Sequence, residues 1–231
     1  MKIGMYADPH YSSAELTCGK RYNSRSLEKI RAAYAHFARQ GCVLVVCLGD
    51  LVDHEPTRER EIDHLREIGA VMHAAPTPTV CLMGNHDAFT LTQDEFYGAL
   101  GIPAPQDTCV DGRHLLFLDA CHFRDGRHYA PGDSGWTDTD YPYAAALREK
   151  LATLAGDAYI FIHQNISPEA EARHRLASAD DIHAILRDSG VVRAVFEGHY
   201  HRGAHTVWDG VAYHTLPAMC EGEDRFFVFD I

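Results

Sequence analysis

The sequence lacks the patterns that mark disulfide-stabilised, secreted and membrane-spanning chains. Its seven cysteines are an odd number without a Cys-x-x-Cys pair. Most of them lie in apolar runs, which favours buried reduced thiols over disulfides or zinc ligation. No apolar run is long enough to span a membrane, and the N-terminus enters a predicted strand without the apolar stretch of a secretory signal. We therefore expect a cytoplasmic protein with no membrane partner.

Positive charge is also scarce. The chain has 21 Lys and Arg against 33 Asp and Glu, a net charge of −12 with His neutral, and no basic run exceeds two residues. Proteins that bind the backbone of long nucleic acids usually carry a basic face, so a long DNA or RNA partner is excluded, whereas a small phosphorylated substrate is not. Internal repeats, low-complexity segments and linkers are absent as well, which predicts a single domain over residues 1–231.

The first hundred residues alternate between strand and helix patterns. Residues 1–7, 43–48 and 78–83 are short apolar runs typical of buried parallel strands. Between them, residues 24–40 and 57–73 show the apolar spacing of helices. Each strand is followed by polar residues, and this β-α-β-α-β order predicts a sheet whose strand ends face one site.

The second half has a different pattern. Asp111-Gly112, between apolar residues, predicts a hairpin. Residues 121–141 are too long for an ordinary connection, so we expect a functional loop or lid. Helices are predicted over 143–155 and 180–189, and strands over 158–162, 191–196, 204–208, 211–215 and 226–229.

Polar clusters follow the predicted strands, and Gly84-Asn85-His86-Asp87 is the most informative. By itself this tetrapeptide is compatible with a turn, because Gly, Asn and Asp are turn formers. Four further clusters accompany it in order along the chain, namely Asp8-x-His10, Gly49-Asp50-x-x-Asp53, His163 and Gly198-His199-x-His201. Carboxylate, imidazole and amide groups are ligands that suit Mn, Fe or Zn. The absence of thiolates argues against a structural zinc site.

The five clusters, in this order, resemble the motifs of the calcineurin-like metallophosphoesterase superfamily. The resemblance extends from Asp8 to His201. It implies an α/β fold, a four-layer α/β/β/α sandwich of two mixed sheets flanked by helices. We expect the first half to supply the βαβ sheet and the second half the more antiparallel one.

The resemblance also implies two divalent or trivalent metal ions and a ligand for each position. The first ion would be held by Asp8, His10 and His201, the second by Asn85, His163 and His199, and Asp50 would bridge both. Two such ions, roughly 3.5–4 Å apart, can clamp a phosphoryl group and hold a hydroxide for in-line attack. If residues 199–201 are extended, both histidines face the metals, because alternate residues point the same way.

Two residues outside this ligand set have catalytic roles by the same resemblance. His86 would lie over the phosphate, stabilising charge or protonating the leaving oxygen. Asp53 would orient His86 and raise its pKa; the alternative is a helix-capping residue before Pro56. For Asp87, hydrogen bonding to loop backbone is favoured over catalysis.

Most of the other histidines are expected to be ordinary surface or loop residues. We assign His54, His64, His73, His114, His174 and His183 to the surface, and His122, His128, His205 and His214 to loops and hairpins around the site.

Three features favour the compact phosphodiesterase and Mn-dependent ADP-ribose diphosphatase branches of the superfamily. His54 follows Asp53, where protein phosphatases have Arg, and Asp87 replaces Glu. A basic-aromatic stretch, residues 19–22, precedes the first helix, as in the diphosphatases.

We expect few cations near the motifs, at most Arg21, Arg124, Arg127 and Arg202. This scarcity predicts hydrolysis of small phosphodiesters or nucleotide diphosphates. A phosphomonoesterase and a non-catalytic metal-binding scaffold are the alternatives. The aromatic residues that could stack on a base are Tyr22, Phe123, Tyr129 and Trp136.

Overall fold

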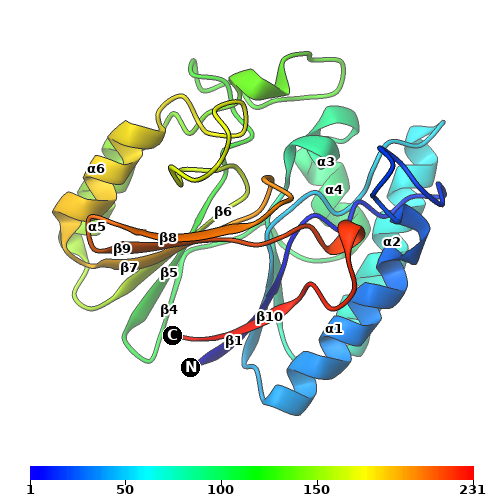
Figure 1. Cartoon of the computed structure of the whole chain (residues 1–231), viewed down its shortest axis with the longest axis horizontal. Coiled ribbons are helices and arrows are strands. Elements are labelled where there is room, and N and C mark those ends of the chain that lie inside the picture. Colours follow the sequence, from blue (N-terminus) through cyan, green and yellow to red (C-terminus); the bar gives the residue numbers. More distant parts are fainter.

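Two β-sheets lie face to face with helices on their outer sides, as Figure 1 shows for the computed structural model of residues 1–231. The first sheet consists of β1 (Lys2–Tyr6), β2 (Leu44–Cys47), β3 (Thr79–Cys81) and β10 (Phe227–Asp230), in the order β10-β1-β2-β3. The second consists of β4 (Thr108–Val110), β5 (Arg113–Leu118), β6 (Ala158–Ile162), β7 (Val192–Glu197), β8 (Ala204–Trp208) and β9 (Val211–Thr215), in the order β4-β5-β6-β7-β9-β8.

Six α-helices and three short 3₁₀ helices complete the chain. They are η1 (Asn23–Arg25), α1 (Ser26–Gln40), α2 (Arg58–Ala74), α3 (Asn85–Thr90), α4 (Gln93–Leu100), η2 (Trp136–Asp138), α5 (Ala144–Thr153), α6 (Ala179–Ser189) and η3 (Met219–Glu221). Helix α1 ends at Gly41, whose left-handed backbone (φ 70°) closes the last turn as the sequence predicts. None of the helices combines the length and apolarity that a membrane span requires.

Three clusters of buried apolar side chains define the layers. One lies between the sheets and contains Ile3 and Met5 of β1 together with Phe161 of β6. Tyr6, the next residue of β1, belongs instead to the cluster beneath α1 and α2, because successive strand residues point to opposite faces. The third cluster joins the other face of the second sheet to α5 and α6, through residues such as Ile160. These clusters confirm the predicted four-layer sandwich.

The sheets differ from the sequence prediction in their composition. β10, from the C-terminal end of the chain, pairs antiparallel with β1 and so completes the first sheet. In the second sheet β5, β6, β7 and β9 are all parallel, and only the edge strands β4 and β8 are antiparallel. The expectation that the first half of the chain alone supplies the first sheet is therefore wrong. The second sheet is the more antiparallel one, as expected, with two antiparallel pairings against one in the first sheet. The difference is one of long-range pairing, which no local pattern encodes.

Backbone hydrogen bonds continue past the strand ends and align the loops that follow them. Asp8 N donates to Gly49 O at 3.1 Å, and His10 N donates to Asp50 O at 3.0 Å. In the second sheet, Gly198 N donates to His163 O at 3.1 Å. All five polar clusters consequently lie at the same end of the two sheets.

All seven cysteines are free thiols, as predicted.

Candidate metal centre

The first group of potential ligands comes from the loops after β1, β2 and β7. Asp8, His10, Asp50 and His201 each offer one ligand atom, and these four atoms lie within 4.8 Å of one another. His10 Nε2 is 3.0 Å from His201 Nε2 and 3.5 Å from Asp50 Oδ2. Ligand bonds of about 2.1 Å place neighbouring donor atoms roughly 3–3.5 Å apart, so the spacing fits a single metal ion.

The orientation of His201 supports the same interpretation. Its Nδ1 donates to Glu221 Oε1 at 2.5 Å, which leaves the Nε2 lone pair of the neutral ring facing His10 Nε2. Metal-bound histidines commonly donate their other ring N–H to a carboxylate in this way. A cation between the two Nε2 atoms would satisfy both lone pairs.

A second group lies beside the first and contains Asp50, His163 and His199. His163 Nδ1 donates to the Leu48 carbonyl at 2.7 Å, which directs Nε2 toward Asp50 Oδ2 at 3.3 Å and Asn85 Oδ1 at 3.2 Å. With a neutral His163, three acceptor atoms converge with no proton between them. Such a set fits a metal ion and is unfavourable without one.

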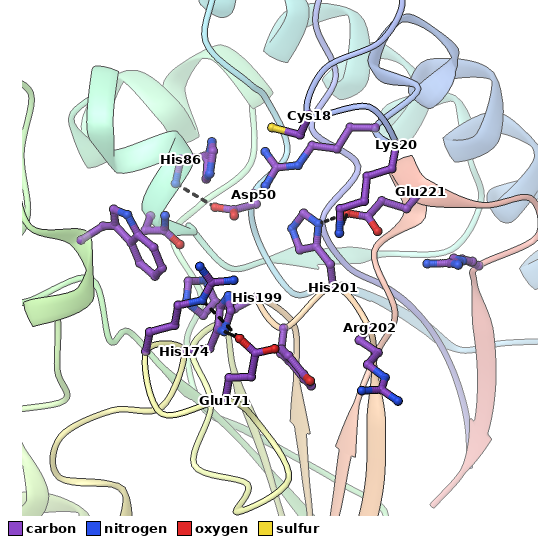
Figure 2. A pocket seen from close by; sticks show the side chains of 16 residues that line it. Cys18, Lys20, Asp50, His86, Glu171, His174, His199, His201, Arg202 and Glu221 are labelled. Carbon is purple, nitrogen blue, oxygen red and sulfur yellow. Dashed lines mark hydrogen bonds and ion pairs between the residues drawn. The ribbon is translucent and has the colours of Figure 1, made fainter.

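Asp50 belongs to both groups. Its Oδ2 faces His10 and His163, and its Oδ1 accepts the backbone N–H of His86 at 2.8 Å. Figure 2 shows the carboxylate between His86 and His201. The side chain is 1 % exposed, so water cannot solvate its charge in place of ligands. The structure thus brings all seven predicted ligand residues into two groups with one shared carboxylate.

Several of these residues have a backbone conformation that is uncommon for non-glycine residues. The φ angles are 54° at Asp8, 46° at His10, 53° at Asp50 and 64° at His199. Left-handed backbone at non-glycine positions costs of order 1–3 kcal/mol each and is concentrated at functional sites. Here it turns the chain sharply at the strand ends, so that the side chains face one another.

Three motif glycines leave room for these side chains. A Cβ at Gly84 would clash with the carboxylate and backbone nitrogen of Asp50. One at Gly198 would lie 2.9 Å from Asp8 Oδ2, and one at Gly49, whose φ is 101°, would lie 2.8 Å from His163 Nδ1. The glycines of the three Gly-containing motifs are therefore explained by close approach of the ligand side chains.

His86 and Asp53 form a pair at the edge of the two groups. His86 Nδ1 lies 3.1 Å from Asp53 Oδ1, and Asp53 Oδ2 accepts from Asn23 Nδ2 at 3.1 Å and Arg21 at 3.3 Å. Burial works to lower the pKa of His86, but the negative charges of Asp50 and Asp53 outweigh it and raise the pKa above its usual value. The shift therefore favours the protonated form of His86.

Asp53 is held as a carboxylate. Burial would raise its pKa, but the hydrogen bond from His86 and the nearby histidine charges lower it.

Asp53 does not cap a helix. The residue that caps α2 is Thr57, whose side chain accepts from Arg60 N, so the capping alternative for Asp53 is wrong.

Asp87 has the backbone-bonding position expected of it. Its Oδ1 accepts from Val52 N at 3.1 Å, and its Oδ2 accepts from Gly84 N at 2.9 Å. The surrounding tetrapeptide differs from the loop that the sequence suggests, because Asn85 begins α3 and Gly84 is its N-terminal cap. Asp87 thus holds the start of α3 against the loop after β2.

Several residues near the site were not found by sequence reasoning. Glu221, in η3, holds His201 and pairs with Lys20 Nζ at 3.1 Å, but it belongs to no recognisable motif. His174 was assigned to the surface, yet its ring lies 5.2 Å from that of His199. Residues 199–201 are not extended as expected, because His199 lies in a turn with a left-handed φ. His199 and His201 nevertheless both face the site.

Two other histidines predicted at the surface are buried. His64 lies 2.8 Å from Glu55 Oε1, and His183 Nδ1 lies 2.8 Å from the Tyr213 hydroxyl. Glu55 also accepts from the backbone N–H of Ser13, and Tyr213 lies in β9. The burial of both histidines therefore depends in part on segments distant in sequence.

A cavity of about 770 Å³ opens over the two ligand groups. Five cationic side chains and three carboxylates line it: Lys20, Arg21, Arg173, Arg202 and Arg225, with Asp50, Glu171 and Glu221. Figure 2 shows Lys20 and Arg202 on the side nearest His201 and Glu221. The scarcity of cations inferred from the sequence is therefore wrong, since distant segments contribute Arg173 and Arg225.

Two of the arginines and three of the aromatic residues that the sequence suggested near the site do not line this cavity. Arg124 pairs with Asp140, and Arg127 pairs with Asp133. Among the four aromatic candidates only Trp136 lines it, with its ring 5.2 Å from His199.

Comparison with known proteins agrees with this geometry. The sequence matches the family described as calcineurin-like phosphoesterase over residues 1–203. The chain belongs to this family. No curated protein matches it significantly.

Solved structures of this phosphoesterase fold resemble the chain along nearly its full length. A dimetal phosphatase from Danio rerio has a TM-score of 0.83 at 18% identity, covering 98% of this chain and 91% of that one. A phosphopantetheinyl hydrolase from Mycobacterium tuberculosis has a TM-score of 0.61 at 13% identity, with coverage of 99% and 95%. GAP50, the anchor in the inner membrane complex of Plasmodium, has a TM-score of 0.59 at 12% identity, with coverage of 99% and 77%. At these identities the likeness shows a shared fold.

Proposed function

We propose that this calcineurin-like phosphoesterase, one domain over residues 1–231, hydrolyses small phosphodiesters or nucleotide diphosphates with two metal ions, Mn, Fe or Zn. The proposed ligands are Asp8, His10 and His201 for one ion, Asn85, His163 and His199 for the other, and Asp50 for both. The observation that carries this proposal is the membership of Asp50 in both ligand groups.

The residues fit two ions by their chemistry. Imidazole nitrogens, carboxylate oxygens and one amide oxygen converge with lone pairs facing inward. The Cys220 thiol also lies within 4.8 Å of the ligand atoms of His10 and His201, but burial raises its pKa and disfavours the thiolate that a metal would require. When bound, a pair of such ions supplies charge neutralisation for the phosphoryl oxygens and an activated water as nucleophile. Glu221 and the Leu48 carbonyl hold the rings of His201 and His163 in the tautomers that ligation requires.

His86 is proposed to donate a proton to the leaving oxygen. Its ring is 33 % exposed and lines the cavity, so a substrate can reach it. Asp53 fixes the ring through Nδ1 and favours the protonated form, which leaves Nε2–H available for the substrate. Asp53 is thus a positioning residue for His86.

The residues that line the cavity support a diphosphate substrate more strongly than the sequence alone does. A nucleotide-sized ligand fits a volume of about 770 Å³. The two ions and His86 would hold the phosphorus that is attacked, while the surplus of cationic over acidic side chains in the lining would hold a second phosphate. Trp136 offers a face on which a base can stack.

The experiment compares kcat/KM for bis(4-nitrophenyl) phosphate, 4-nitrophenyl phosphate, 2′,3′-cyclic AMP and ADP-ribose, with saturating Mn²⁺ and after chelation. We expect Mn²⁺-dependent turnover that is faster for the diester or diphosphate substrates than for the monoester. The background control is Asp50→Asn. A clear preference for the monoester would favour the phosphatase alternative, and turnover no higher than that of Asp50→Asn would favour a non-catalytic scaffold.

A further inference from the structure

A third group of potential metal ligands lies outside the cavity and shares no residue with the first two. It consists of Asp119, His122 and His128, whose ligand atoms lie within 4.8 Å of one another. Asp119 directly follows β5, at the end of the sheet where the loops gather. The two histidines face each other across a tight hairpin at the start of the 121–141 segment, in which Tyr129 N donates to Cys121 O at 2.7 Å.

The distances within this group suit a metal ion. His128 Nε2 is 3.3 Å from Asp119 Oδ2, and His122 Nδ1 is 3.8 Å from Asp119 Oδ1. Donor atoms around one zinc ion are roughly 3.3–3.5 Å apart, so small rotations of the side chains would complete the site. Without a metal, an ion pair with Asp119 accounts for the position of His128, and a hydrogen bond from His122 Nδ1 to the Asp119 carbonyl, at 3.2 Å, holds the other ring. Metal binding would replace this hydrogen bond as the His122 ring turns toward the carboxylate.

The surroundings prepare the ligand atoms. His128 Nδ1 donates to the Tyr129 carbonyl at 2.6 Å, which leaves the Nε2 lone pair of the neutral ring facing Asp119, as in known zinc sites. Gln93 is the first residue of α4, and its amide nitrogen Nε2 lies 2.6 Å from Asp119 Oδ2 and 3.1 Å from His128 Nε2. Rotation of the amide by 180° exchanges its nitrogen and oxygen, so that the oxygen takes the position beside these two atoms.

We propose that Asp119, His122 and His128 form a third metal site, selective for Zn²⁺ or a similar late first-row cation, with the Gln93 amide oxygen as a further ligand. Two imidazoles and a carboxylate are the ligands that zinc prefers among oxygen and nitrogen donors. In the bound form His122 carries its proton on Nε2 and ligates through Nδ1. This site is independent of the proposed hydrolysis.

The proposed zinc site joins three segments of the chain. It ties the hairpin to the end of β5 and to α4, and the backbone of His122 also accepts from Asp140 N, at the far end of the 121–141 segment. Trp136, which lies between these two anchor points, reaches the cavity beside His199. Zinc binding is therefore expected to stabilise the segment that presents Trp136 (Figure 1).

Metal stoichiometry tests the site directly. Chelated protein is dialysed against Zn²⁺ and analysed by mass spectrometry for bound metal. We expect three Zn²⁺ per wild-type chain and two for His122→Gln/His128→Gln, with Asp119→Asn as a second variant if the first fails to fold. The matched control, His36→Gln/His114→Gln, removes two histidines outside all three groups and should bind three. Equal zinc content in the wild type and in every folded variant would overturn the proposal. A wild type that saturates at two ions and loses one in the variants would contradict the proposed dinuclear centre and support the third site.

Proteolysis tests the effect on the segment. Arg124 and Arg127 lie in the hairpin between the two histidines, with side chains 69 % and 54 % exposed. At free Zn²⁺ about 100-fold above the dissociation constant, the population of opened hairpin falls about 100-fold. Tryptic cleavage after these residues should slow by up to that factor in the wild type and not in His122→Gln/His128→Gln. Equal protection of both proteins, or protection of neither, would contradict the site.

Discussion

Replacement of His86 by alanine separates proton donation from metal binding. The side chain lies 3.1 Å from Asp53, and its ring packs edge-on against that of His10, with the ring centroids 4.5 Å apart. Its backbone N–H, which alanine keeps, donates to Asp50. Loss of a general acid lowers the rate roughly 10²–10⁴-fold, which is about 3–5 kcal/mol of transition-state stabilisation. His86→Ala should therefore retain both metals and lose rate within that range.

The assay measures kcat for two diesters that differ only in leaving group, one 4-nitrophenolate and one alkoxide, at matched metal content. The loss should be much smaller for 4-nitrophenolate, which leaves without a proton. Because the pKa of His86 is raised and its protonated form is the active one, wild-type activity on the alkoxide substrate should fall as pH rises through that pKa; the fall should be absent in His86→Ala. His54→Ala, a neighbouring exposed histidine, is the control. An equal loss for both leaving groups would refute proton donation.

Three further predictions follow from the metal groups. Asp50→Asn should lose activity and weaken at least one metal; two ions with unchanged turnover would disprove the bridge. Gly84→Ala should lower the free energy of unfolding by about 1–3 kcal/mol and displace the Asp50 carboxylate, as thermal unfolding and metal analysis would show; wild-type values in both would contradict this close approach. In the metal-free protein burial works against protonation, but nearby carboxylates raise the pKa of His163 to about 10 and of His201 to about 9. Metal loading at pH 7.5 should therefore release about two protons, and affinity should weaken as pH falls; calorimetry in buffers of different ionisation enthalpy would detect this, and no proton release would contradict it.

The positions of the ligand residues could be predicted because strand ends are local features. An apolar run followed by Asp8 or Asp50 indicates both the strand and the point at which its side chains reach the site. Parallel pairing then brings the ends together, as the bond from His10 N to Asp50 O shows. The gathering of these residues at one end of the sheets follows from this rule. The four-layer fold, the division of the ligands into two groups and the His86–Asp53 contact were expected from the resemblance to the calcineurin-like metallophosphoesterases.

What could not be predicted depends on contacts between distant segments. Glu221, in η3, reaches His201 from beyond β8 and β9, and β10 pairs with β1 from the other end of the chain. The cations Arg173 and Arg225 enter the cavity lining in the same way. Asn85 begins a helix because Asp87 bonds the Gly84 backbone, although the same residue types are common in turns. In each case the partner, and not the local sequence, decides the outcome.

The most direct test of the central claim, two ions sharing Asp50, is electron paramagnetic resonance of the Mn²⁺-loaded protein during a metal titration. Two Mn²⁺ ions joined by a bridging carboxylate are exchange-coupled and give a spectrum distinct from that of isolated ions. We expect hydrolysis of bis(4-nitrophenyl) phosphate to rise in proportion to the coupled signal, and both to be lost in Asp50→Asn. Full activity with only the isolated-ion spectrum would contradict the dinuclear site.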